Sequence, residues 1–377
     1  MQQSISTFIR IVIPCYNEQA VMSTIHSLSA CDKGDFGVEI IVVVNSYQIS
    51  PEAILQLNRQ SYAELSAFAQ ENNTPLFQLT PLWIENLPGH QTGAGVPRKI
   101  GMDEAVRLFQ KEGNLTGIIV SLDADCTVAN NYLTEIYRCF KQYKLKSATI
   151  EFHHPVEHLP EEDALRKATE AYEEYLRYYR AALEYTGYPY AYYTIGSAFA
   201  VTAATYLQVG GMGRQQAGED FYFLHKVFPL GKTRFIDTTC VYPAARTSDR
   251  VPFGTGPAIH KMLEEKQLKK VSYQVAAFTE LKDFFDEIDS FFKLPEQEIE
   301  KKVSVLPKTL QIFLQEDDFG HKIVEISQHT ASVANFRKRF FSYFTAFKLL
   351  RYLNQVHPVP HAWADVKKQF LQLTVVK

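Results

Sequence analysis

The regular alternation of short apolar runs with longer amphipathic segments constrains the fold of this chain more than any other feature. Apolar runs at residues 8–14, 38–44 and 117–122 have the length and composition of buried strands. The segments between them carry apolar residues at helical spacing. A chain in which strands and helices alternate favours a doubly wound parallel sheet with helices on both faces.

The remaining expected elements follow from the same patterns. The other strands are residues 76–82, 147–152, 193–202 and 233–241, and the helices are residues 18–29, 51–71, 97–111, 131–143, 161–185 and 221–227, with Asn17 as the N-cap of the first. From His260 onward the pattern is helical throughout. We therefore expect a domain boundary near residue 258.

Two aspartates, Asp123 and Asp125, follow the apolar run at residues 117–122. They would lie at the carboxyl end of a strand, where open α/β sheets bind ligands. Two carboxylates in that place are costly unless a cation accompanies them. Oxygen ligands favour a hard divalent cation, Mg²⁺ or Mn²⁺, which can also hold a diphosphate. The alternative is an acidic turn in which Asp caps the next helix.

Composition excludes several classes of function. The net charge of −3 gives no basic footprint for nucleic acid. The five cysteines form no CxxC pair, which makes a disulfide framework or a zinc site unlikely and fits a reducing compartment. No signal pattern opens the chain, and no run approaches about 18 apolar residues. These features predict a cytoplasmic protein.

Three motifs in register resemble those of family 2 glycosyltransferases with the GT-A fold. Residues 11–18 (IVIPCYNE) resemble the opening strand motif, and Asp123-Ala124-Asp125 matches the DXD motif. Gly210-Gly211-Met212 followed by Gly218-Glu219-Asp220 resembles the Gly-Gly turn and the ED motif. The resemblance covers residues 8–245 and does not extend to the C-terminal region.

The resemblance implies a Rossmann-like mixed sheet flanked by helices, which binds a nucleoside diphosphate sugar. The catalytic domain would be residues 1–258, with a nucleotide-binding half at about 1–150 and an acceptor half at about 151–258, and residues 259–377 would be a helical accessory region. The implied reaction is inverting transfer of the sugar to a hydroxyl on a glycan, a lipid-linked acceptor or a small molecule. Asp220 would be the general base, and Glu219 would orient the base or the acceptor. Mn²⁺ or Mg²⁺ would be held by Asp125, with Asp123 near the metal or the ribose.

Further residues are assigned to the donor by the same resemblance, each with an alternative. Glu18 would contact the nucleotide, unless it merely begins a helix with Asn17. Asn45 stands where the family often has an aspartate for the base, and its amide both donates and accepts. Arg98, with Lys99 as the alternative, would meet the diphosphate. His260 would be a third metal ligand, although a lone histidine is more often structural. The expected nucleotide-binding set is Pro14, Tyr16, Glu18, Asn45, Arg98, Asp123, Arg246 and Arg250. The last two lie in a loop for which the alternative interpretation is a mobile surface linker.

Two other classes of function stay open. A sugar-phosphate nucleotidyltransferase also joins a nucleotide-binding domain to a metal site, but residues 14–18 replace its usual Gly-rich loop. A non-catalytic sugar-binding protein on the same fold is the second. The basic, Phe-rich segment 336–352 suits burial in a core or a homodimer, or peripheral contact with a membrane.

Overall fold

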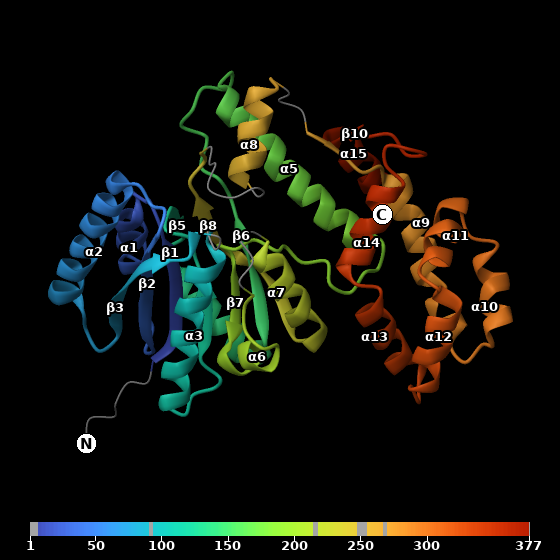
Figure 1. Cartoon of the computed structure of the whole chain (residues 1–377), viewed down its shortest axis with the longest axis horizontal. Coiled ribbons are helices and arrows are strands. Elements are labelled where there is room, and N and C mark those ends of the chain that lie inside the picture. Colours follow the sequence, from blue (N-terminus) through green and yellow to red (C-terminus); the bar gives the residue numbers. More distant parts are fainter. Residues whose placement is uncertain (1–6, 90–92, 214–217, 247–254, 267–269, 377) are drawn as a thin grey trace. The chain divides into compact units, whose positions relative to one another are not determined.

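An eight-stranded mixed sheet forms the centre of the N-terminal part of the chain (Figure 1). The structure is a computed structural model, which describes residues 7–89, 93–213, 218–246, 255–266 and 270–376. The strand order is β3-β2-β1-β4-β7-β6-β8-β5. The strands are β1 (Thr7–Cys15), β2 (Gly37–Tyr47), β3 (Phe77–Leu87), β4 (Ile118–Ser121), β5 (Cys126–Val128), β6 (Ser147–Phe152), β7 (Phe199–Thr202) and β8 (Thr233–Pro243).

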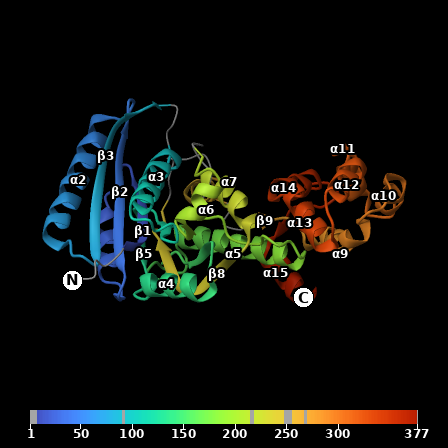
Figure 2. The same cartoon turned by 90° about the horizontal axis from the view of Figure 1, so that it is seen from below.

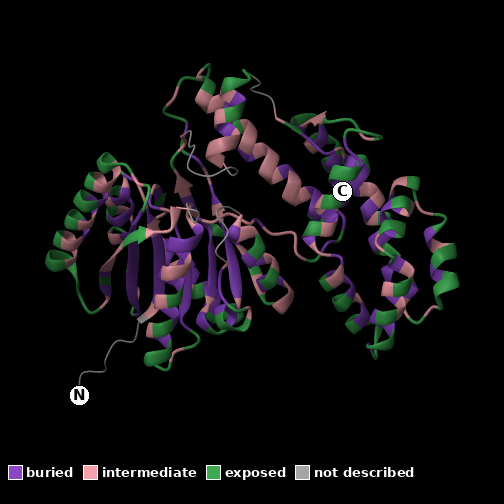
Figure 3. Ribbon diagram, viewed as in Figure 1, coloured by how far each residue is buried: buried purple, intermediate pink, exposed green. Residues whose placement is uncertain are grey.

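The sheet combines a parallel half with antiparallel insertions. Strands β3, β2, β1 and β4 run parallel, and every residue of β2 is buried. Strand β7 is antiparallel to both β4 and β6, and β5 is antiparallel to β8. The predicted mixed sheet flanked by helices is confirmed, whereas a purely parallel sheet is wrong. Figure 3 shows that the strands are mostly buried, whereas buried and exposed residues alternate along the helices, as expected for helices that cover a sheet.

Helices pack on both sides of this sheet, and Figure 2 shows α3 and α4 on opposite sides. The helices that contact its strands are α1 (Val21–Ser29), α2 (Glu52–Asn72), α3 (Gly95–Lys111), α4 (Tyr132–Tyr143) and α6 (Ala203–Gln208). Helices α7 (Glu219–Val227) and α8 (Thr255–Glu264) belong to the same part of the chain. The predicted cap at Asn17 is wrong, because α1 begins at Val21 and Asn17 has a left-handed backbone with φ 52°. The three-residue strand β5 and the short helix α6 were not expected.

The contacts divide the chain into two compact units. The first is Met1–Thr169 with Thr194–Lys266, and the second is Glu170–Tyr193 with Gln267–Lys377. Helix α5 (Ala164–Tyr185) contributes to both. This division departs from the expected single boundary near residue 258, since residues 170–193 group with the C-terminal segment.

The second unit is mainly helical, as predicted, with one small ladder of β9 (Val271–Ser272) and β10 (Ala364–Asp365). Its other helices are α9 (Val275–Asp286), α10 (Glu296–Val303), α11 (Lys308–Glu316), α12 (Phe319–Gln328), α13 (Val333–Tyr343), α14 (Ala346–Gln355) and α15 (Val366–Val376). Phe284, Phe285, Phe340 and Phe344 pack against one another in its core, two of these ring pairs edge to face and one stacked, and are at most 1% exposed. Burial of these rings favours a core role for segment 336–352. None of the described helices is long and apolar enough to cross a membrane.

Candidate active site

Several of the predicted site residues gather at one edge of the sheet, because β1 pairs in parallel with both β2 and β4. Glu18 follows β1, Asn45 lies near the carboxyl end of β2, and Asp123 and Asp125 follow β4. Three further residues, distant in sequence, reach the same edge through ion pairs: Arg98 at the start of α3, Glu219 at the start of α7, and Arg246 after β8.

Arg246 bridges two carboxylates that are distant from each other in the sequence. Its Nη2 atom is 2.5 Å from Glu18 Oε2 and 2.6 Å from Asp125 Oδ2. The Glu18 side chain is only 4% exposed. Burial and the neighbouring Asp123 raise the pKa of Asp125, while Arg246 opposes that rise. The two acids therefore converge on a point that holds positive charge.

Arg98 joins the DXD-like motif to the ED-like motif. Its side chain is 2% exposed, with Nη2 2.5 Å from Asp123 Oδ1 and Nη1 bonded to Glu219 Oε1. Burial acts to lower the pKa of Arg98, but the charges of Asp123, Glu219 and Asp220 raise it, and the net result lies above its ordinary value. Arg98 is thus a buried cation that fixes the distance between the two motifs.

Asp220 follows Glu219 in the first turn of α7. Burial, and then the charge of Glu219, raise its pKa from the ordinary 3.8 to about 7, while Arg98 opposes the rise. Its Oδ1 accepts a 2.7 Å hydrogen bond from the Phe221 backbone N–H. A carboxylate with a pKa near neutrality can accept a proton in one step and release it in the next.

Asn45 presents an unusual buried amide. The residue is fully buried, and among the described residues neither its Oδ1 nor its Nδ2 has a hydrogen-bond partner. Its backbone is held in place, since Asn58 Nδ2 donates to Asn45 O at 2.7 Å. A buried amide with both polar atoms unpaired is costly, and in this conformation neither atom is exposed to a ligand.

Tyr47 and Ser50 lie near the predicted residues Asn45 and Tyr16 but were not themselves predicted as site residues. Tyr47 lies on the same face of β2 as Asn45. The centroid of its ring is 4.9 Å from that of Tyr16, and its hydroxyl donates a 2.7 Å hydrogen bond to Gly93 O. The two-residue spacing of Asn45 and Tyr47 in a strand was a signal for this. Ser50 Oγ lies 3.3 Å from the Tyr16 hydroxyl.

Gly196 lies directly against the Arg98 guanidinium. A Cβ atom there would be 2.9–3.1 Å from the guanidinium atoms. The Ser121 hydroxyl donates to Gly196 O at 2.6 Å and holds this backbone in place. No sequence signal distinguished Gly196, because the need for glycine arises only from a contact across the fold.

Other predicted residues are placed differently. His260, on α8, lies 3.1 Å from Glu264 one helical turn away, and Lys99 pairs with Asp103 at 2.7 Å. Within the described part of the chain no three His, Cys, Asp or Glu side chains form a cluster that could hold a metal ion. The third-ligand role of His260 therefore stays a prediction. Arg250 lies outside the described residues, and Pro14 is half-buried in β1.

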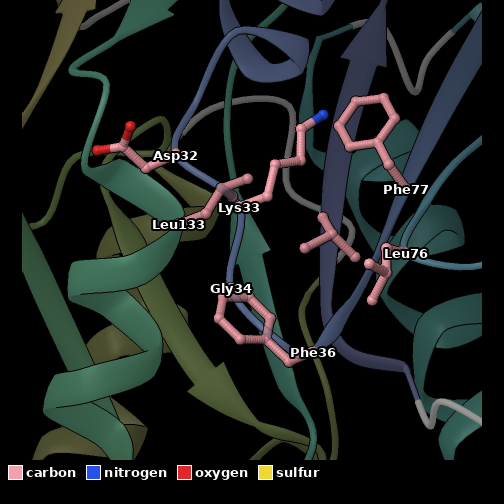
Figure 4. Close-up of a pocket in the computed structure, with 8 residues that line it drawn as sticks. Asp32, Lys33, Gly34, Phe36, Leu76, Phe77 and Leu133 are labelled. Atoms are coloured by element: carbon pink, nitrogen blue, oxygen red, sulfur yellow. The ribbon is translucent and has the colours of Figure 1, made fainter.

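A small pocket at the opposite end of the strands is unrelated to this site (Figure 4). Asp32, Lys33 and Gly34 line it on the segment before β2, with Phe77 at the start of β3 and Leu133 on α4. The Lys33 ammonium lies over the Phe77 ring at 4.2 Å. No predicted site residue takes part.

Comparison with known proteins gives structural neighbours only. No protein-family model and no curated protein sequence matches the chain. Among solved structures, S. aureus TarS 1-349 has a TM-score of 0.42 and 11% identity, over 90% of this chain and 92% of that one. The same protein in complex with UDP-GlcNAc has a TM-score of 0.43 and 12% sequence identity, over 89% of this chain and 91% of that one. The mannosyltransferase PcManGT from Pyrobaculum calidifontis, in complex with GDP-Man and Mn²⁺, has a TM-score of 0.41 and 12% sequence identity, over 92% of this chain and 85% of that one.

Proposed function

We propose that the protein is an inverting glycosyltransferase that moves a sugar from a nucleoside diphosphate donor to a hydroxyl acceptor. One observation carries the proposal: Arg98 contacts both Asp123 and Glu219, so the acidic pair after β4 and the acidic start of α7 form one site. Acids expected to hold a diphosphate and an acid expected to accept a proton are then adjacent. This adjacency is what transfer of a glycosyl group requires.

Asp220 is the general base in this proposal. It takes the proton of the acceptor hydroxyl while that oxygen bonds to the anomeric carbon, and the bond from that carbon to the diphosphate oxygen breaks on the opposite face. The configuration at the anomeric carbon is inverted. Burial and the adjacent Glu219 give Asp220 a pKa of about 7, which lies near the operating pH and suits a general base.

The nucleotide occupies the ends of β1 and β2 in this proposal. Asn45 is the residue assigned to the base edge, which requires a local rearrangement that exposes its amide, and the Tyr16 and Tyr47 rings pack against each other nearby. Asp123 faces the ribose with the part of its carboxylate that Arg98 leaves accessible, since its side chain is 38% exposed. Arg246 meets the diphosphate, because a guanidinium binds phosphate oxygens bidentately.

A divalent cation fits the residues present. Asp125, with Asp123 two residues before it, offers hard oxygen ligands, and its Oδ2 lies 2.6 Å from the positively charged Arg246 nitrogen. Mg²⁺ and Mn²⁺ are commonly bound by one or two carboxylates together with substrate phosphates. When bound, such an ion neutralises the charge that develops on the leaving diphosphate.

Turnover of a panel of nucleotide sugars tests the function. Wild type is compared with Asp220→Asn and Asp125→Ala, with Mn²⁺ or Mg²⁺ and with EDTA, by release of the nucleoside diphosphate. We expect metal-dependent turnover of at least one donor, strongly reduced in both variants. Absence of turnover with every donor, or full activity in both variants, contradicts the proposal.

A further inference from the structure

The two aspartates after β4 have different partners. Asp123 pairs with Arg98 and, through it, with Glu219, whereas Asp125 pairs with Arg246 and, through it, with Glu18. Each half of the acidic pair therefore belongs to a separate ion-pair network. Only the second network places two carboxylates on a single nitrogen atom.

Both carboxylates of the second network are preorganised. Glu18 Oε1 accepts a 2.9 Å hydrogen bond from the Ala20 backbone N–H, which leaves Oε2 directed at Arg246. Asp125 Oδ1 lies 3.7 Å from the Cys126 thiol, and its Oδ2 is directed at the same Arg246 nitrogen. One oxygen of each acid thus has a neighbour within its own segment, and the other points at a shared cation position.

We propose that Glu18 and Asp125, rather than Asp123 and Asp125, form the divalent cation site, and that Arg246 fills this site until the donor arrives. The inference rests on the proposed function and adds to it a second metal ligand and a cation exchange. A guanidinium and a metal ion cannot occupy the same position between two carboxylate oxygens. Entry of the metal therefore displaces Arg246, which is then available to the donor diphosphate.

The exchange makes metal and nucleotide binding cooperative. Metal alone must break the ion pairs of Arg246 without giving that side chain a new partner. Metal with a nucleoside diphosphate replaces those ion pairs with guanidinium–phosphate contacts. Each ligand therefore raises the affinity for the other, and linkage makes the effect reciprocal.

Direct binding of Mn²⁺ tests this without measuring turnover. Free Mn²⁺ is followed by electron paramagnetic resonance, with and without UDP or GDP, for wild type, Arg246→Ala, Glu18→Gln and Asp123→Asn. Gln at position 18 keeps an oxygen for the Ala20 N–H and replaces the second, negatively charged oxygen by an NH₂ group, which cannot bind a metal. Arg138→Ala is the matched control, because Arg138 forms an exposed ion pair with Glu135 on α4.

The variants have opposite expected effects. Arg246→Ala raises the affinity for Mn²⁺ alone and reduces the gain from added nucleotide, each within the roughly five- to 150-fold range of typical coupling. Glu18→Gln weakens Mn²⁺ binding roughly tenfold or more, as loss of a ligand charge predicts. Arg138→Ala leaves Mn²⁺ binding within about twofold of wild type. Asp123→Asn removes a nearby charge but no ligand, so it weakens binding of Mn²⁺ alone less than Glu18→Gln does.

Other results overturn the inference in distinguishable ways. If Mn²⁺ and nucleotide bind but Arg246→Ala does not strengthen binding of Mn²⁺ alone, the exchange is wrong and the proposed function stands. If Asp123→Asn weakens Mn²⁺ binding as much as Glu18→Gln does, the ligand assignment is wrong. If neither UDP nor GDP binds wild type with Mn²⁺, the proposed function fails as well.

Discussion

Asp220 is the residue whose protonation should set the pH dependence of the reaction. Its pKa is raised to about 7, and in its proposed role as general base it would act in the ionised form. Below that pH the carboxyl is protonated, so kcat should fall about tenfold per pH unit, and above it kcat should reach a plateau. Asp220→Asn should lower kcat by roughly 10²–10⁴-fold. It should also abolish the ascending limb of the pH–rate profile, in which kcat rises with pH up to about 7. Steady-state rates from pH 5 to 9 with a saturating donor measure both effects.

The control for this prediction is a carboxylate outside the site. Glu104 pairs with Arg107 on the surface of α3, and Glu104→Gln should leave the pH profile unchanged. A profile of Asp220→Asn with the same limb near pH 7 would show that another group titrates there.

Gly196 should control Arg98 through a single contact. In Gly196→Ala the new methyl group overlaps the guanidinium, which must withdraw from Asp123 and Glu219. Since Arg98 lowers the pKa of Asp220, its withdrawal should move the ascending limb of kcat to higher pH and reduce kcat. A pH–rate profile measures this shift, which a loss of stability alone would not produce.

The matched substitution for Gly196 is Gly320→Ala in α12. There the new Cβ meets only flexible side chains, with Glu296 Cγ at 3.3 Å and Glu300 Cγ at 3.8 Å. We expect an unchanged profile in this variant, and an unshifted limb in Gly196→Ala would contradict the positioning role of Arg98.

At the scale of elements, the close approach of α3 to the sheet depends on Gly101. A Cβ there would overlap Val12 Cγ1 on β1 and would lie 3.0 Å from Val43 Cγ2 on β2. Gly101→Ala should therefore lower the free energy of unfolding by about 1–3 kcal/mol, the usual cost of overpacking a core. Urea unfolding followed by circular dichroism measures this difference.

Gly113, just beyond the end of α3, provides the comparison. It has a left-handed backbone with φ 69°, and a Cβ added there would meet no atom within 4 Å. Asparagine tolerates that conformation, so Gly113→Asn should have a much smaller effect on stability than Gly101→Ala. Equal stabilities of Gly101→Ala and wild type would mean that α3 shifts away from the sheet at no cost.

At the scale of the whole molecule, ligand binding should protect one of the two units. Every described residue assigned to the donor lies in the unit formed by Met1–Thr169 and Thr194–Lys266. A nucleoside diphosphate with Mn²⁺ at about 100 times its Kd should stabilise the folded state that binds it by about 2.7 kcal/mol. Hydrogen exchange should slow at the ends of β1, β2 and β4, where the site residues lie.

The second unit serves as the internal reference in that experiment. Peptides from α9 to α14 should exchange at the same rate with and without ligand. Protection confined to the second unit would place the nucleotide elsewhere.

The sequence by itself determined the element types and the positions of the acids at the strand ends. Runs such as residues 38–44 are apolar except for Glu39, and that pattern specifies a strand buried on both faces. Residues 147–152 were predicted with the bounds that β6 has. Asp123 and Asp125 necessarily follow the run that becomes β4. These are local properties, so one segment suffices to read them.

Only the tertiary structure decided which charged groups pair. Glu18 and Arg246 are 228 residues apart, and Arg98 and Glu219 are 121 apart. No spacing rule connects such residues; the strand order of the sheet brings them together. The same holds for β5, whose three residues are a strand only because β8 lies beside them, and for Gly196, which must be small only because Arg98 packs against it. Sequence pattern fixes what a segment becomes, whereas long-range packing fixes what it touches.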